Sequence, residues 1–115
     1  MEPSKLSRKH LPLTEATFYI LAALMEPQHG YAVMQEVGGM SEGTVKLGPG
    51  TLYGVVTKLE QSKLIKKVGE VERRKIYVIT DAGQEVLDDQ IDRLGIMLRN
   101  ASGKRNKLAR TKDKG

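Results

Sequence analysis

The chain contains no cysteine, no tryptophan and a single phenylalanine among its 115 residues. The absence of cysteine excludes disulfide bonds, thiolate catalysis and cysteine-bound zinc. The two histidines, His10 and His29, cannot form a metal site without several partners, so we expect neither a metal nor another cofactor. No nucleophile, base and orienting residue form a recognisable pattern, which argues against an enzyme.

Long hydrophobic runs are also absent. The longest uninterrupted apolar run, residues 18–25, is too short to span a bilayer, and the polar residues 1–10 lack the apolar core of a signal peptide. The sequence therefore predicts a cytoplasmic protein without membrane contact. An apolar content of 39% over this length predicts one domain with a modest core.

Positive charge is concentrated at one end of the chain. The net charge is +5, yet residues 99–115 alone hold seven basic residues against one acidic residue, so the rest is nearly neutral. Because residues 101–115 are polar, basic and without clear periodicity, we predict a disordered tail there. Such a tail would serve either solubility or nonspecific binding to nucleic acid.

The first predicted helix follows a flexible N-terminal segment over residues 1–12. Thr14 is a suitable N-cap, and Leu13 and Phe18 occupy the two positions of a hydrophobic staple. Apolar residues cover nearly the whole circumference of this helix, which indicates packing partners on two sides. Pro27 is expected to end it.

A second, short amphipathic helix is predicted from His29, whose expected role is a helix cap or a surface position. The glycine pair at residues 38–39 is predicted to end this helix and to leave a mobile loop.

The third predicted helix begins abruptly at Thr51, after the Gly-Pro-Gly sequence at residues 48–50. Its core face is formed by apolar residues at helical spacing, namely Leu52, Val55, Val56 and Leu59. The opposite face carries small or uncharged residues with two larger ones at its sides: Gly54, Thr57 and Gln61, flanked by Tyr53 and Lys58. Such a face favours close approach to a groove.

Two segments rich in β-branched residues, 64–68 and 75–79, predict a hairpin whose charged tip lies over residues 69–74. Three helices followed by a hairpin is the order of a winged helix-turn-helix domain. We therefore predict a mainly α fold with a small β-hairpin over residues 13–80.

A further helix is predicted over residues 81–100, capped by Thr80. Its apolar residues are spaced four, three and four apart: Leu87, Ile91, Leu94 and Leu98. This spacing is typical of a coiled-coil seam with a second subunit, although docking onto the chain's own core is the alternative.

The sequence resembles the PadR-type bacterial transcriptional regulators, in the short form with a single C-terminal helix. The resemblance rests on "LTEATFYILAALMEPQHGYAVMQEV", "LGPGTLYGVVTKLEQSKLI" and "RRKIYVITDAGQEVL". Its most specific elements are His29-Gly30-Tyr31, Gly50-Thr51-Leu52-Tyr53 and Arg73-Arg74. It covers residues 13–98, which is most of the chain.

The resemblance implies a sequence-specific DNA-binding regulator, a repressor that acts as a homodimer on a pseudo-palindromic operator. The third helix would enter the major groove of double-stranded DNA, with the glycine-rich turn setting its N-terminus against a phosphate. The expected DNA contacts are Tyr31, Lys46, Gly50, Thr51, Tyr53, Gly54, Thr57, Lys58, Gln61, Arg73, Arg74 and Lys75. The expected dimer interface comprises Phe18, Leu21, Leu87, Ile91, Leu94 and Leu98.

Several alternatives remain open at this point. Tyr53 is either a base contact or a buried ring with its hydroxyl at the surface, and Tyr31 either touches a phosphate or packs on the third helix. Glu70 and Glu72 at the hairpin tip oppose phosphate approach. Some relatives sense a small-molecule effector, but this sequence identifies none. The competing function is a winged-helix protein-interaction module without specific DNA readout.

Overall fold

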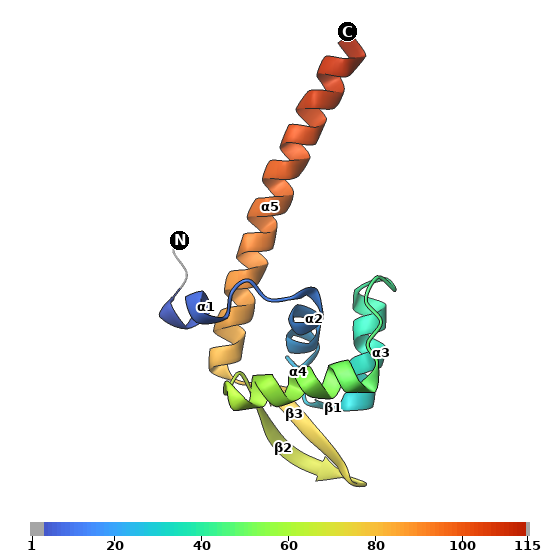
Figure 1. The fold of residues 1–115 in the computed structure, drawn as a ribbon, viewed down its shortest axis with the longest axis vertical. Helices are drawn as coiled ribbons and strands as arrows, with labels where there is room; N and C mark the ends of the chain where they lie inside the picture. The colour runs from blue at the N-terminus through green and yellow to red at the C-terminus, as the bar shows by residue number, and fades with distance from the viewer. Residues whose placement is uncertain (1–3, 115) are drawn as a thin grey trace.

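The computed structural model describes residues 4–114, with side chains up to residue 112 (Figure 1). Its helices and strands follow in the order α1 (Lys5–His10), α2 (Glu15–Ala23), β1 (Gln28–His29), α3 (Gly30–Met40), α4 (Pro49–Gln61), β2 (Ile65–Val71), β3 (Arg74–Ile79) and α5 (Asp81–Lys114). The predicted fold class is confirmed: the molecule is mainly helical with a small antiparallel sheet.

Helix α2 lies at the centre of the core. Its Thr14 cap is as predicted, since the Thr14 hydroxyl oxygen accepts a hydrogen bond from the Thr17 N–H at 3.1 Å. Ile20 and Leu21 are fully buried, and α2 contacts α3, α4 and α5. The partners expected on several sides of this helix therefore come from the same chain. Helical geometry ends at Ala23, earlier than the predicted stop at Pro27.

The N-terminal segment is ordered over its described part, so the prediction of a flexible segment over residues 1–12 is wrong for residues 4–12, while residues 1–3 lie outside the described residues. Ser4 caps α1, and the buried Ser7 donates a hydrogen bond to the carboxylate of Asp89. The Leu13 N–H donates to Gln90 Oε1 at 2.7 Å. The sequence did not predict that this segment is ordered, because the two hydrogen bonds that hold it, Ser7 to Asp89 and Leu13 to Gln90, join residues far apart in the chain.

Helix α3 continues through the glycine pair that was predicted to end it. The helix ends instead in a Schellman motif, in which the Gly43 N–H donates to the Gly38 carbonyl at 2.9 Å and the Glu42 N–H to the Gly39 carbonyl at 3.0 Å. Glu42 and Gly43 have positive φ angles of 53° and 80°. A glycine weakens a helix by about 1 kcal/mol without stopping it, whereas a left-handed residue reverses the chain.

The sheet has the strand order β1-β3-β2, with every pairing antiparallel. Strands β2 and β3 are longer than predicted, because only Glu72 and Arg73 separate them. These residues have φ angles of 50° and 67°, as in a two-residue type I′ turn. The two-residue strand β1, which was not predicted, pairs Gln28 with Tyr77 and joins the start of α3 to the hairpin.

Helix α5 begins where predicted and runs much further. The Thr80 hydroxyl oxygen accepts from the Gly83 N–H at 3.1 Å, which confirms the cap. The disordered tail predicted over residues 101–115 is wrong as far as residue 114, since helical backbone continues there, and Gly115 lies outside the described residues. Lys, Arg, Leu and Ala favour helix, and the composition rule for disorder ignores that propensity.

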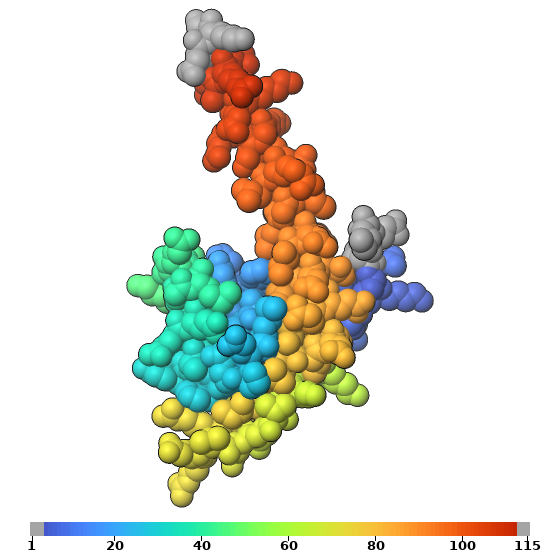
Figure 2. Space-filling model, turned by 180° about the vertical axis from the view of Figure 1, so that it is seen from behind, coloured from blue at the N-terminus to red at the C-terminus, as the bar shows by residue number. Residues whose placement is uncertain are grey.

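The C-terminal part of α5 projects away from the domain (Figures 1 and 2). Residues 91–101 are all exposed, and the molecule measures 64 Å along its longest axis. None of the helices over residues 4–114 combines the length and apolar character that crossing a bilayer requires.

Candidate nucleic-acid interface

Helix α4 begins at the Gly-Pro-Gly sequence itself, two residues before the predicted start. Gly48 is the N-cap and Pro49 occupies the first helical position, where its missing N–H costs nothing. The Gly48 carbonyl accepts the first helical bond from the Leu52 N–H at 3.0 Å, but no side chain caps this terminus. The positive end of α4 is therefore open to an external anion.

The two faces of α4 separate as its periodicity predicted. Leu52, Val56 and Leu59 are buried, whereas Val55, also predicted for the core face, is half-buried against the core. The opposite face is exposed at Thr51, Tyr53, Gly54, Thr57, Lys58 and Gln61. A Cβ atom added to Gly50 or Gly54 would meet no atom within 4 Å. Packing within the chain therefore does not require glycine at either position, and both leave the helix surface bare.

The ring of Tyr53 lies against the start of α3. A Cβ atom on Gly30 would come within 2.9 Å of Tyr53 Oη and 3.0 Å of Leu52 Cδ2. Tyr53 is still 53% exposed, so its ring is neither buried in the core nor free in solvent. Gly30 belongs to the His29-Gly30-Tyr31 motif, but the sequence did not predict that Gly30 makes room for the Tyr53 ring, because this role depends on a contact between α3 and α4.

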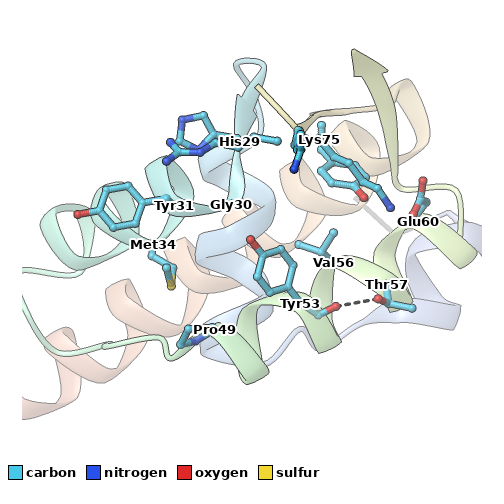
Figure 3. Close-up of a pocket in the computed structure, with 13 residues that line it drawn as sticks. His29, Gly30, Tyr31, Met34, Pro49, Tyr53, Val56, Thr57, Glu60 and Lys75 are labelled. Carbon is cyan, nitrogen blue, oxygen red and sulfur yellow. Dashed lines mark hydrogen bonds between the residues drawn. The ribbon is translucent and has the colours of Figure 1, made fainter. Parts of the chain in front are cut away.

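A groove of about 580 Å³ runs between the start of α3, the exposed face of α4 and strand β3 (Figure 3). It brings together predicted contacts from three separate segments of the chain. The lining residues are His29, Gly30, Tyr31, Met34, Pro49, Tyr53, Val56, Thr57, Glu60, Arg73, Arg74, Lys75 and Tyr77. In Figure 3, Tyr53 and Thr57 lie side by side on α4 and Lys75 lies across the groove from them.

The hydrogen bonds at the groove settle the conformation of several of these residues. The Thr57 hydroxyl donates to the Tyr53 carbonyl at 2.8 Å, which leaves its oxygen free to accept. Tyr31 Oη accepts from Gln35 Nε2 at 3.0 Å, and the ring is exposed. His29 is the N-cap of α3, with Nδ1 accepting from the Ala32 N–H at 3.4 Å, as one of its two expected roles required.

The charge of the groove is positive at the hairpin end. Within residues 4–112, the one ion pair closer than 4.0 Å joins Lys67 to Glu70 at 3.6 Å, so Arg73, Arg74 and Lys75 have no acidic partner there. The ion pair also offsets one of the two acidic residues at the tip. Burial raises the pKa of the Tyr77 hydroxyl, and the Glu60 carboxylate raises it further, so Tyr77 stays a protonated donor.

Six predicted DNA contacts are not among the residues that line the groove. Three of them, Gly50, Thr51 and Gly54, are exposed on the first two turns of α4. Lys46 is exposed in the loop before α4, and Gln61 is exposed at the opposite end of that helix. Lys58 lines a different hollow, with Thr14, Thr17 and Val55, on another side of α4. Thr57 and Lys58, adjacent in sequence, therefore face different surroundings.

The residues predicted for a dimer interface divide into two groups. Leu21 and Leu87 are fully buried in the core of the single chain. Neither is therefore available for the contact with a second subunit that was predicted for them. Seam spacing alone did not distinguish docking onto the chain's own core from contact with a partner. Ile91, Leu94 and Leu98 remain exposed, at 45%, 41% and 70%, while Phe18 is half-buried beside Tyr19.

The chain is similar to several known proteins. It is 36% identical over 75 residues to an uncharacterised 37.1-kDa protein of transposon TN4556 in Streptomyces fradiae; the match covers 64% of this chain but about a fifth, 21%, of that protein. A PadR family transcriptional regulator from Eggerthella lenta is 26% identical, with a TM-score of 0.60 and coverage of 87% of this chain and 84% of that one. A transcriptional regulator from Clostridium thermocellum has the same fold, at 20% identity and a TM-score of 0.65, with 87% and 97% of the two chains covered.

Residues 20–89 match the family described as "Transcriptional regulator PadR-like family", which spans the core, the groove and the start of α5. The resemblance found in the sequence is thereby confirmed, and so is the expectation that the protein is no enzyme, because members of this family are DNA-binding regulators. The chain therefore belongs to the PadR-like family of transcriptional regulators.

Proposed function

We propose that this regulator binds a specific, pseudo-palindromic operator as a homodimer and represses transcription. The observation that carries the proposal is the exposed face of α4, whose Gly50 and Gly54 have no packing reason to be glycine. A bare helix surface beside the basic residues of the hairpin suits close approach to the floor of a major groove.

The residues around the groove supply two kinds of contact. Thr57 and Tyr53 on α4 would meet base edges, and the open N-terminus of that helix would hold a phosphate. Arg73, Arg74 and Lys75 would hold the DNA backbone near the hairpin. Lys58, which faces another hollow, would reach the backbone on the far side of α4.

The proposal of a homodimer is based on the exposed apolar residues of α5. Ile91, Leu94 and Leu98 form a row that a monomer would leave in water. Two α4 helices in one dimer would read half-sites about 34–36 Å apart, one turn of DNA. Occupancy of a promoter is enough for repression, since it needs no contact with the transcription machinery.

Selection of bound sequences from a random DNA pool tests the proposal. We expect an enriched motif with two-fold symmetry. The triple variant Arg73→Ala/Arg74→Ala/Lys75→Ala should lose affinity for all DNA. Its matched control, Lys5→Ala/Arg8→Ala/Lys9→Ala, removes the same charge from α1, away from the groove, and should bind nearly normally. A folded dimer that enriches no motif would favour the protein-interaction module instead.

A further inference from the structure

The C-terminal part of α5 is positively charged and stands clear of the domain (Figure 2). Residues 99–112 contain six basic residues, all exposed, and no acidic one: Arg99, Lys104, Arg105, Lys107, Arg110 and Lys112. In the described residues 4–112, none of the six has an acidic side chain within 4.0 Å. This positive charge is therefore available to a partner from outside the chain.

Four of the six basic residues lie along one side of the helix. Arg99, Gly103 and Lys107 follow one another at intervals of four residues, and Arg110 comes three residues later. Lys104, three residues before Lys107, widens this side. We call the four charged residues, Arg99, Lys104, Lys107 and Arg110, the basic face.

The other two basic residues, Arg105 and Lys112, lie on the opposite side of the helix. They come seven and fourteen residues after Leu98, in line with the exposed apolar row that also includes Ile91 and Leu94. The basic face is therefore turned away from this row. A subunit that covers the apolar row would leave the basic face in solvent.

The centre of the basic face is a glycine. A Cβ atom on Gly103 would meet no atom within 4 Å, so packing within the chain does not require glycine there. Two shallow hollows of the helix surface share Gly103 and Lys107 as lining residues. Arg99 and Lys104 line one of them, and Arg110 lines the other. Bare backbone between positive side chains lets a chain of phosphates come close.

The length and charge of the basic face suit a polyanion. Arg110 lies eleven positions after Arg99, which is about 16 Å along the helix. Each strand of duplex DNA has a phosphate every ~3.4 Å of axis, so this length faces about four or five phosphates. Lys104, Lys107 and Arg110 are three residues apart, and like charges at this spacing repel one another until an anion neutralises them.

A lipid surface fits the same stretch less well. Apart from one glycine, residues 102–112 contain only two apolar residues, and a helix enters a lipid surface with a whole apolar side. Duplex DNA needs no such side, because its phosphates bind charge alone.

Nearer the domain, the same side of α5 carries the opposite charge. Asp92 lies seven residues before Arg99 and is the last of an exposed acidic stripe, which comprises Asp81, Glu85, Asp88 and Asp92. The acidic stripe repels phosphates, so DNA on the basic face is confined to the far end of the helix. That end points away from the hairpin and from the groove at α4 (Figure 1).

We propose that the basic face binds the phosphate backbone of a second segment of duplex DNA while the groove at α4 holds the first, so that the protein bridges two segments. The first segment is the operator of the proposed function, on which the bridge therefore rests. DNA has a persistence length of about 150 bp, so a short duplex on α4 cannot bend back to the far end of α5. The second segment is another molecule or a distant part of the same one.

Capture of one short duplex by another tests the bridge. A random-sequence duplex on beads is saturated with protein and washed, and a fluorescent duplex is then offered at low salt. The wild-type chain should capture it, and Lys107→Gln/Arg110→Gln should lower the affinity for it at least tenfold. The matched control, Arg105→Gln/Lys112→Gln, removes the same charge from the other side of the same stretch and should capture nearly normally.

Undiminished capture by Lys107→Gln/Arg110→Gln would overturn the proposal, because the two α4 helices of a dimer would then hold both duplexes. Equal losses for the two double variants would also overturn it, since DNA would then gather around the helix without preferring the basic face. All four side chains are exposed, so neither variant should disturb the fold.

The salt dependence of binding gives a second measurement, made in the background of Arg73→Ala/Arg74→Ala/Lys75→Ala. This background weakens the groove and leaves the basic face as the main contact with random DNA. Adding Lys107→Gln/Arg110→Gln should reduce the slope of log K against log salt by about two units, and adding the matched control by less than one. An unchanged slope for the first would show that the basic face touches no phosphates.

Failure of the bridge and failure of the proposed function give different results. A protein that enriches an operator from a random pool but captures no second duplex would overturn only the bridge. A protein that enriches no operator, yet loses random-DNA binding with the basic face, would overturn the operator and retain the second DNA contact.

Discussion

The first turns of α4 and α5 both contain glycine, and the two glycines serve opposite purposes. At Gly83 in α5, a Cβ atom would overlap the Leu64 carbonyl oxygen and lie 2.8 Å from Ile79 Cγ1. At Gly50 in α4, the same atom would meet nothing within 4 Å. One glycine lets two parts of the chain pack closely, and the other leaves a helix bare for an outside partner. The residue type alone does not reveal which.

Gly83→Ala should have the largest effect in this comparison. Its Cβ atom meets backbone, which cannot move aside as a side chain can, so we expect a loss of about 3 kcal/mol in the free energy of unfolding. Thermal denaturation should show a melting temperature lower by roughly 10 °C or more. A variant with wild-type stability would mean that α5 can shift away from Leu64 without cost.

Gly30→Ala should have an intermediate effect. Its Cβ atom would press on Tyr53 Oη and Leu52 Cδ2, which are ends of side chains, so the cost should be about 1 kcal/mol. Displacement of Tyr53 should reduce affinity for the operator more than affinity for random DNA, measured in parallel titrations. Equal losses on both DNAs would show that Tyr53 does not read bases.

Gly54→Ala should separate stability from binding. Alanine in the middle of α4 should raise the free energy of unfolding by up to about 1 kcal/mol, because glycine is the poorer helix former. Affinity for DNA should nevertheless fall, since the added methyl group occupies the approach surface. Chemical denaturation and DNA titration of the same sample would check both; a variant that gains stability and keeps full affinity would exclude Gly54 from the interface.

Thr57→Ala and Lys58→Ala should change stability least, by less than about 0.5 kcal/mol, since both side chains are exposed. Thr57→Ala should alter which sequences are preferred, whereas Lys58→Ala should weaken binding to every sequence and reduce the slope of log K against log salt by about one unit. The same loss on all sequences for both variants would refute this division of roles.

Local signals in the sequence predicted the helices well. The structure confirms the caps at Thr14 and Thr80 and the buried face of α4. These features were predictable because each depends on residues only a few positions apart. Strand β1 was missed because it exists only through pairing with β3, almost fifty residues later. The helical structure of residues 101–114 was not predicted, because the low hydrophobicity of this segment indicates disorder whereas its helix propensity favours a helix.

The sequence predicted which residues of the candidate site are exposed on each element, but not how those elements come together to form the groove. Periodicity placed Tyr53 and Thr57 on one side of α4, but only the fold brings them beside Tyr31 and Lys75. The separation of Lys58 from Thr57 and the fit of Tyr53 on Gly30 depend on how α3 and β3 pack, which no local pattern encodes. The DNA contacts themselves remain predictions.

The close packing of Gly83 on Leu64 attaches α5 rigidly to the domain, so that any rotation of the helix base is transmitted along its whole length. Strand β3 passes into the helix through Thr80, whose N–H donates to the Leu64 carbonyl at 3.0 Å, so no flexible linker separates them. A helix of 34 residues is about 50 Å long, and a tilt of ~5° at its base would move the far end by ~4 Å. In the proposed dimer, small changes at this one joint would therefore alter the distance between the two α4 helices and, with it, the operator spacing that the protein accepts.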